Sequence, residues 1–187
     1  MRIERVEALR ADAAWRNFSF LKISTACGIT GWSEYNEDFG SRGLSPVIEA
    51  LVPMIIGMDP RASEAIVAKL HVATRQARGG INQQAIAAIE NALLDIRGKE
   101  AGKPVHALFG GPIRERIPVY WSHFGTYRIA QRGKGFLPEL RTYDDLAAHA
   151  AEVKAQGFRC LKTNLFRFRD GALQYFNQGF GRTPGWP

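Results

Sequence analysis

The segment AIENALLDIRGKEAGKPVHALFGG, residues 88–111, constrains the fold of this 187-residue chain more than any other stretch. It continues a pattern in which apolar residues recur at helical spacing, namely Ile81, Ile86, Ile89, Leu93 and Ile96. This spacing predicts a helix over residues 81–97 with one buried face. A run rich in glycine, with one proline, follows the helix at once and ends at Gly110-Gly111. Because glycine tolerates backbone angles that other residues avoid, we expect a compact turn directly after the helix.

Two further helices are expected before this one. Ser45 followed by Pro46 has the pattern of an N-cap and a first-turn proline, and an apolar stripe then continues to Gly57. Asp59-Pro60 repeats the same start signal, and the second helix is expected to end at the RGG run of residues 78–80.

Residues 1–35 have the alternating pattern of β-strands. We expect one strand over residues 1–10, a polar and aromatic loop, ADAAWRNFS, over residues 11–19, and two strands joined near Gly28. Three consecutive strands with short connections predict an antiparallel meander. Together with the helices, this meander predicts an α+β domain over residues 1–116.

The pattern changes after the glycine-rich run. IPVYWSHF (117–124) and FRCLKTNLF (158–166) each indicate a strand, and a helix capped by Thr142 and closed at Gly157 lies between them. Strand, helix and strand in this order predict a βαβ unit with two parallel strands. Residues 117–187 are therefore expected to begin a second, α/β domain, although residues 176–187 show no strand or helix pattern.

Composition narrows the classes of partner. The net charge is +7, but the arginines are scattered without a basic run of five, so we expect no nucleic-acid partner. No apolar run approaches the roughly 20 residues of a membrane helix, and the charged first ten residues are not a secretory signal. A cytoplasmic location without membrane contact is therefore expected.

The two cysteines, Cys27 and Cys160, lie in apolar, strand-like segments and belong to no CxxC or histidine-rich cluster. We expect two reduced and mostly buried thiols, because cytosolic chains seldom carry structural disulfides. A zinc site is not expected.

Four segments in order resemble the mandelate racemase and muconate lactonizing enzyme family of the enolase superfamily. They are the hairpin GITGWSEY, the segment AAIENALLDIRGKEAGKPVHALFGG, the strand IPVYWS and the strand GFRCLKTNLF. The resemblance implies an α+β capping domain followed by a modified (β/α)8 barrel. It also implies that the glycine-rich run lies where cap and barrel meet, and that residues 117–123 and 158–164 are the first two barrel strands.

A complete barrel takes roughly 250 residues, and residues 117–187 are far fewer. We interpret the second domain as the incomplete start of a (β/α)8, TIM-type barrel. The family's Mg²⁺ ligands are acidic residues at the ends of the third, fourth and fifth barrel strands, and a His-Asp base pair lies later still. The resemblance therefore implies a Mg²⁺-dependent longer protein whose metal ligands are not in this chain.

The family removes a proton next to a substrate carboxylate and usually has Lys-x-Lys at the end of the second barrel strand. This chain has Lys162-Thr163-Asn164. By the resemblance, Lys162 is a catalytic residue that supports the carboxylate, and Asn164 takes the place of the second lysine and binds substrate. Asparagine cannot accept a proton from carbon at neutral pH, which disfavours a two-base racemisation. A solvated lysine at a strand end is the alternative for Lys162.

Three more residues are candidate substrate contacts. His123 stands at the end of the first barrel strand, with an exposed loop histidine as the alternative. Trp15 and Arg16 lie in the loop between the first two strands, which closes over the substrate in the family. A packed tryptophan beside a solvated arginine is the alternative for this pair.

The favoured function is that of an acid-sugar dehydratase: proton abstraction next to the carboxylate, then loss of water. A racemase, epimerase or cycloisomerase of the same family remains an alternative. So does an inactive remnant that serves as a binding or oligomerisation module. By the resemblance, the partners are a small carboxylate substrate and further copies of the chain in a homo-oligomer.

Overall fold

The structure is a computed structural model that describes residues 1–13, 16–129, 138–169 and 172–175. The chain divides into two compact units, Met1–Ile113 and Arg114–Pro187. The domain boundary expected after residue 116 stays a prediction.

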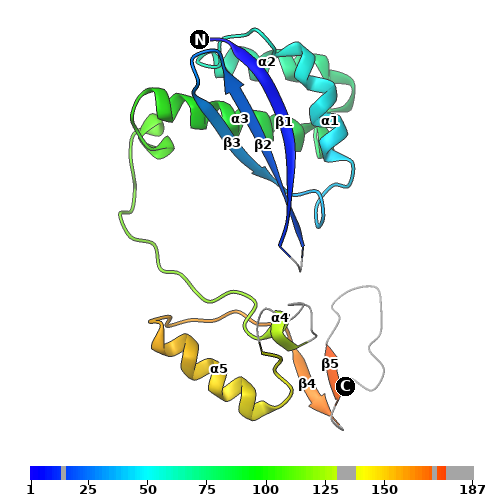
Figure 1. Ribbon diagram of the computed structural model, residues 1–187, viewed down its shortest axis with the longest axis vertical. Helices are drawn as coiled ribbons and strands as arrows, with labels where there is room; N and C mark the ends of the chain where they lie inside the picture. Colours follow the sequence, from blue (N-terminus) through cyan, green and yellow to red (C-terminus); the bar gives the residue numbers. More distant parts are fainter. Residues whose placement is uncertain (14–15, 130–137, 170–171, 176–187) are drawn as a thin grey trace. The chain divides into compact units, whose positions relative to one another are not determined.

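The first unit contains the expected antiparallel meander. Its strands are β1 (Ile3–Asp12), β2 (Asn17–Thr25) and β3 (Thr30–Tyr35), in the order β1-β2-β3 (Figure 1). Leu21 of β2 lies opposite Ala8 of β1 and Ser33 of β3. The three-stranded prediction for residues 1–35 is therefore confirmed, with a connection between β1 and β2 that is shorter than expected.

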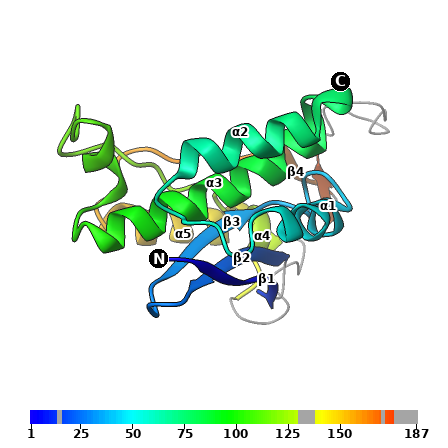
Figure 2. The same cartoon turned by 90° about the horizontal axis from the view of Figure 1, so that it is seen from above.

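Helices cover one face of this sheet. They are α1 (Leu44–Leu51), α2 (Ser63–Ala73) and α3 (Gly80–Glu100), with short 3-10 helices at Val52–Met54, Arg75–Ala77 and Val105–Phe109. Figure 2 shows α2 and α3 lying side by side. The side chains that meet between sheet and helices are fully buried and include Leu21, Ile23, Ile48, Ile66, Leu70, Ile86, Ile89, Leu93 and Ile96. The helical periodicity that predicted α3 thus describes its buried face.

Two of the expected helix starts are wrong. Gly43, with φ 87°, precedes α1 as its N-cap residue, and Ser45 lies inside the first turn with its hydroxyl bonded to Tyr35 and Glu37. A serine whose side chain is used by the core cannot cap its own helix. The second helix begins at Ser63 rather than after Asp59-Pro60, because Asp59 accepts hydrogen bonds from Arg61 in a turn before the helix.

The second unit contains α4 (Thr126–Ile129), α5 (Tyr143–Ala155) and an antiparallel hairpin of β4 (Phe166–Arg169) and β5 (Ala172–Tyr175). The predicted Thr142 cap of α5 is confirmed: its hydroxyl accepts from the Asp145 N–H at 3.1 Å, and the Asp145 carboxylate accepts from the Thr142 N–H at 2.9 Å. The hairpin was not predicted from the sequence.

The two full strands expected over 117–124 and 158–166 are wrong, although their parallel direction is confirmed. In the described part of the second unit, they pair through one parallel bridge between Trp121 and Leu161. Pro118 has no N–H to donate to a ladder, and a lone parallel pair is weakly stabilised. Ile117 and Val119 are accordingly 75% and 68% exposed.

Both cysteines carry free thiols, as expected, but both are exposed rather than buried. Cys27 lies in the turn between β2 and β3, and Cys160 lies in extended chain beside the Trp121 bridge. Cys27 is exposed because it lies in a turn, and Cys160 is exposed because the expected strand around it does not form. No helix among the described residues is long and apolar enough to cross a membrane.

Candidate functional site

The backbone around Trp121 brings the two expected barrel strands together. The Trp121 N–H donates to the Cys160 carbonyl at 3.0 Å, and the Lys162 N–H donates to the Trp121 carbonyl at 2.8 Å. This is the hydrogen-bond pattern of a parallel pair. It fixes the backbone of Lys162 beside the end of the first predicted strand, one residue beyond the bridge.

The parallel pairing ends at His123, in a turn over residues 122–125. In a regular ladder, the N–H of residue 123 would reach the Lys162 carbonyl, but the Phe124 N–H donates there instead, at 2.8 Å. His123 has φ 53° and is the only non-glycine residue in the described chain with a positive φ. Strained backbone angles of this kind cluster at functional sites. The candidate His123 therefore precedes the residue whose backbone is bonded to Lys162.

The side chains of Lys162 and Asn164 are both exposed. Trp121 packs edge-on against His149 of α5, with ring centroids 5.9 Å apart, so it faces that helix. Leu161, which pairs with Trp121, lines a hollow together with Val153 and Lys154 of α5. The Thr163 hydroxyl donates to the Phe124 carbonyl at 3.0 Å and holds the chain between the two candidates.

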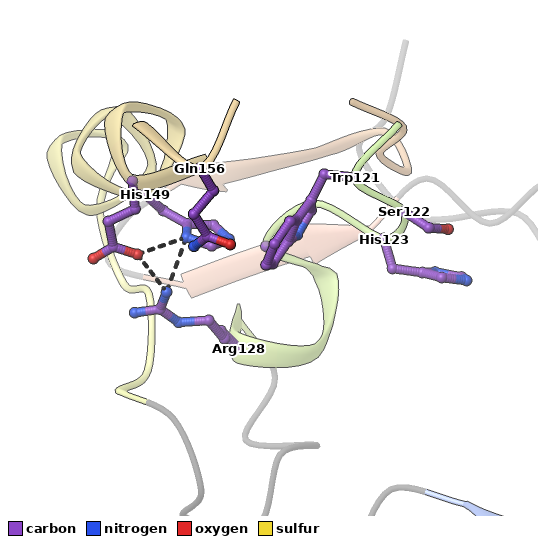
Figure 3. Close-up of a pocket in the computed structure, with 8 residues that line it drawn as sticks. Trp121, Ser122, His123, Arg128, His149 and Gln156 are labelled. Atoms are coloured by element: carbon purple, nitrogen blue, oxygen red, sulfur yellow. Dashed lines mark hydrogen bonds and ion pairs between the residues drawn. The ribbon is translucent and has the colours of Figure 1, made fainter. Parts of the chain in front are cut away.

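A cavity of about 280 Å³ lies beside this turn. Its lining consists of Trp121, Ser122, His123, Gly125, Arg128, His149, Glu152 and Gln156. Figure 3 shows the imidazole of His123 directed away from the polar group formed by Arg128, His149 and Glu152. His123 therefore lines the cavity, but its ring does not converge on this polar group.

Three side chains of this cavity are bonded to one another (Figure 3). Arg128 Nη1 lies 2.9 Å from His149 Nδ1 and 3.3 Å from Glu152 Oε2, and the last two atoms are 3.0 Å apart. His149 is buried, and its ring stacks on Phe124 at 4.9 Å. The hydrogen bond with His149, and then the Arg128 guanidinium, lower the pKa of the Glu152 carboxyl below its ordinary value.

This group joins three segments of the second unit. Arg128 Nε donates to the Pro138 carbonyl at 2.9 Å, and the Leu140 N–H donates to the Arg128 carbonyl at 3.1 Å. These two bonds join α4 to residues 138–140, and the contacts of Arg128 with His149 and Glu152 join α4 to α5. The sequence analysis did not predict this contact of Arg128, His149 and Glu152. The i, i+3 spacing of His149 and Glu152 on one helix is a local signal, but nothing in the sequence links them to Arg128.

Arg16 lies in the first unit and already has partners. Its Nη2 donates to Glu34 Oε1 at 3.0 Å, and its guanidinium carbon lies 3.7 Å above the Phe18 ring. Its charge is therefore compensated by the sheet in this structure. Trp15 lies outside the described residues.

The described residues hold no group of three or more His, Cys, Asp or Glu side chains that could bind a metal ion. Hard cations such as Mg²⁺ need several clustered oxygen ligands. The part of the chain that the structure describes therefore does not fit a Mg²⁺ site.

Comparison with known proteins gives matches along most of the chain. Residues 10–110 match the model of the mandelate racemase / muconate lactonizing enzyme N-terminal domain. A D-galactonate dehydratase from Xanthomonas euvesicatoria pv. vesicatoria is 36% identical over 120 residues, which are 64% of this chain and 31% of that protein. The chain thus spans about a third of the length of the curated relatives it matches.

Two solved structures match 94% and 66% of the chain. A candidate L-alanine-DL-glutamate epimerase from Burkholderia xenovorans strain LB400 has a TM-score of 0.86 and 41% identity, over 94% of this chain and 44% of that one. The same Burkholderia protein has also been solved with magnesium and fumarate. A candidate galactarate dehydratase from Agrobacterium radiobacter, with sodium and L-malate bound, has a TM-score of 0.60 and 30% identity, over 66% of this chain and 31% of that one. The fold class expected from the sequence, a cap domain followed by the start of a TIM-type barrel, is confirmed.

Proposed function

Because the chain belongs to the mandelate racemase / muconate lactonizing enzyme family, we propose that it is the N-terminal part of an enzyme that dehydrates an acid sugar. The reaction removes the proton next to the substrate carboxylate and then expels a hydroxyl group as water. The 36% identity to a D-galactonate dehydratase supports this reaction and substrate class. The fumarate and L-malate in the two structural neighbours support a small carboxylate as the ligand.

The observation that carries the proposal is Asn164 in the segment Lys162-Thr163-Asn164. Racemisation needs a base on each face of the substrate, and an amide cannot act as one at neutral pH. Elimination of water needs one base to remove the proton and one acid to release the leaving group. A site with Asn164 in place of the usual second lysine therefore favours dehydration.

Each candidate residue has a chemical task in this proposal. The exposed Lys162 ammonium pairs with the substrate carboxylate and stabilises the negative charge that develops when the proton leaves. The Asn164 amide bonds a substrate hydroxyl. His123, in the turn that follows Trp121, contacts the same ligand. Arg16 exchanges its partner Glu34 for the substrate, and Trp15 beside it excludes water.

Mg²⁺ supplies charge stabilisation for the enediolate in this superfamily. The described residues do not fit a Mg²⁺ site, so we place its ligands in the later barrel strands of the longer protein. A cytoplasmic location and a homo-oligomeric assembly are part of the same proposal.

A racemase or epimerase is the second candidate. It is favoured by the 41% identity to the Burkholderia protein, which extends over 94% of this chain. That protein is a candidate epimerase, so the likeness conflicts with the argument from Asn164 and needs a direct test.

The test is to incubate the longer protein with Mg²⁺ and a panel of acid sugars in heavy water. Dehydration yields a 3-deoxy-2-keto acid, which semicarbazide traps as an ultraviolet-absorbing product. Keto acid formation is the expected result. Deuterium-labelled epimer of the substrate without any keto acid would instead establish the epimerase and overturn the dehydratase.

A further inference from the structure

We propose that Asp38 is a positioning residue that fixes Arg16 at the β1–β2 connection, with Glu37 as its support. Only the effect on catalysis rests on the proposed function, in which Arg16 contacts the substrate. The contacts themselves all lie within the first unit.

β2 begins at Asn17, which has no partner in β3. β3 ends at Tyr35, which lies opposite Ser19, so Asn17 and Phe18 extend past the last strand partner on that side. The Asn17 N–H donates instead to Asp38 Oδ2 at 2.8 Å. A carboxylate thus replaces the carbonyl that a longer β3 would have supplied. Asn17 follows Arg16 directly, so this bond fixes the backbone from which the Arg16 side chain departs.

The residue before Asp38 holds the other strand of the same hairpin. Glu37 Oε2 accepts from Arg10 of β1 at 2.7 Å, and Glu37 Oε1 accepts from the Gly43 N–H at 3.0 Å. The Ser45 hydroxyl also bonds to Glu37 and lies 2.7 Å from the Tyr35 hydroxyl. Glu37 is only 9% exposed, so it is a rigid support for the exposed Asp38 beside it.

Arg16 completes the arrangement. Glu34 at the end of β3 accepts from its guanidinium, the Phe18 ring lies beneath it, and the Ala13 N–H donates to its carbonyl at 3.0 Å. Near the end of β3, the Glu34, Glu37 and Asp38 carboxylates therefore each accept a hydrogen bond from the β1–β2 hairpin. The donors are the Arg16 side chain, the Arg10 side chain and the Asn17 N–H. Complementary pairs at both strands of a hairpin fix its end against the loop that follows β3. Asp38 differs from Glu34 because it holds backbone rather than the Arg16 charge.

The direct test uses amide hydrogen exchange and nuclear Overhauser effects on the 187-residue chain. In Asp38→Ala, we expect exchange of the Asn17 amide to accelerate about tenfold, because a bond to a charged acceptor is lost. We also expect the proton contacts between the Arg16 side chain and the Phe18 ring to weaken. The Ile23 amide at the centre of the sheet should exchange as in the wild type.

Matched variants separate positioning from general destabilisation. Asp38→Asn keeps an oxygen acceptor and should restore both readouts to within about threefold of the wild type. Glu49→Ala removes an exposed carboxylate of α1 that has no side-chain bond among the described residues, and should change neither. Asp38→Leu replaces Asp38→Ala if that variant does not fold.

The consequence for catalysis is measured on the longer protein. Asp38→Ala should raise the KM for the acid sugar with a smaller change in kcat, and Asp38→Asn should restore it. If the wild type turns over no acid sugar, the proposed function fails, while exchange and Overhauser effects still decide the positioning claim. An Asn17 amide that exchanges at the wild-type rate in Asp38→Ala, with the Arg16 contacts intact, would overturn the inference.

Discussion

Replacing Gly31 with alanine tests how closely β3 packs on α3. A Cβ atom at position 31 would lie 2.1 Å from the Ala92 carbonyl oxygen and 2.7 Å from Ile96 Cγ1. Ordinary contacts between such atoms are about 3.5 Å, so the overlap with the Ala92 oxygen exceeds about 1 Å. The Ala92 oxygen belongs to the helix backbone and cannot rotate away. Overpacking costs typically 1–3 kcal/mol, and a backbone clash places Gly31→Ala at the upper end, about 3 kcal/mol.

Gly28→Ala is the matched control for this prediction. Gly28 has φ 86°, and no atom lies within 4 Å of its added Cβ, so only the left-handed backbone opposes the change. That term costs about 1–2 kcal/mol. Urea unfolding followed by far-ultraviolet circular dichroism measures both variants. A Gly31→Ala variant that loses less than about 1 kcal/mol, or no more than Gly28→Ala, would refute the close packing of sheet and helix.

Three further predictions concern charge, metal and association. Burial acts to raise the pKa of Glu37, but hydrogen bonds from Ser45 and Arg10 outweigh it and hold that pKa below its ordinary value. The ionised Glu37 therefore stabilises the folded state fully above the unfolded pKa, about 4.3, and this contribution is lost as the pH falls through the folded pKa. The difference in unfolding free energy between wild type and Glu37→Gln should accordingly shrink below about pH 4. Titration calorimetry of residues 1–187 with Mg²⁺ should show only the weak binding of a typical protein surface, and a micromolar site would contradict the proposed location of the ligands. Because Ile113, Ile117 and Val119 are exposed, the isolated chain should self-associate in sizing experiments, and a concentration-independent monomer would contradict this.

The sequence predicted the first unit well because its signals are local and mutually consistent. The 3.6-residue periodicity of Ile86, Ile89, Leu93 and Ile96 needed no tertiary information to define the buried face of α3. Ser45 shows where local reasoning ends. Its N-cap pattern is valid by itself, but the buried Glu37 and Tyr35 compete for the same hydroxyl. That competition comes from residues outside the helix.

The second unit was harder to predict, because its features depend on partners distant in sequence. The strand pattern of residues 117–124 is strong, yet within it only Trp121 forms a bridge, since Pro118 has no N–H to donate and a parallel pair without further strands is weakly stabilised. The contact of Arg128 with His149 joins residues 21 positions apart and has no local signal. The assignment of Lys162 and Asn164 rests on the family resemblance, and the structure adds only their exposure and their position after the bridge.

The most direct test of the central claim is the turnover of an acid sugar by the longer protein carrying Lys162→Ala. Lys154, an exposed lysine in the last turn of α5, supplies the control variant Lys154→Ala. We expect Lys162→Ala to form keto acid at least about 100-fold more slowly than the wild type, because a charge that stabilises the transition state is removed, while Lys154→Ala should keep wild-type activity. A Lys162→Ala enzyme with unimpaired turnover would contradict the assignment of the active site.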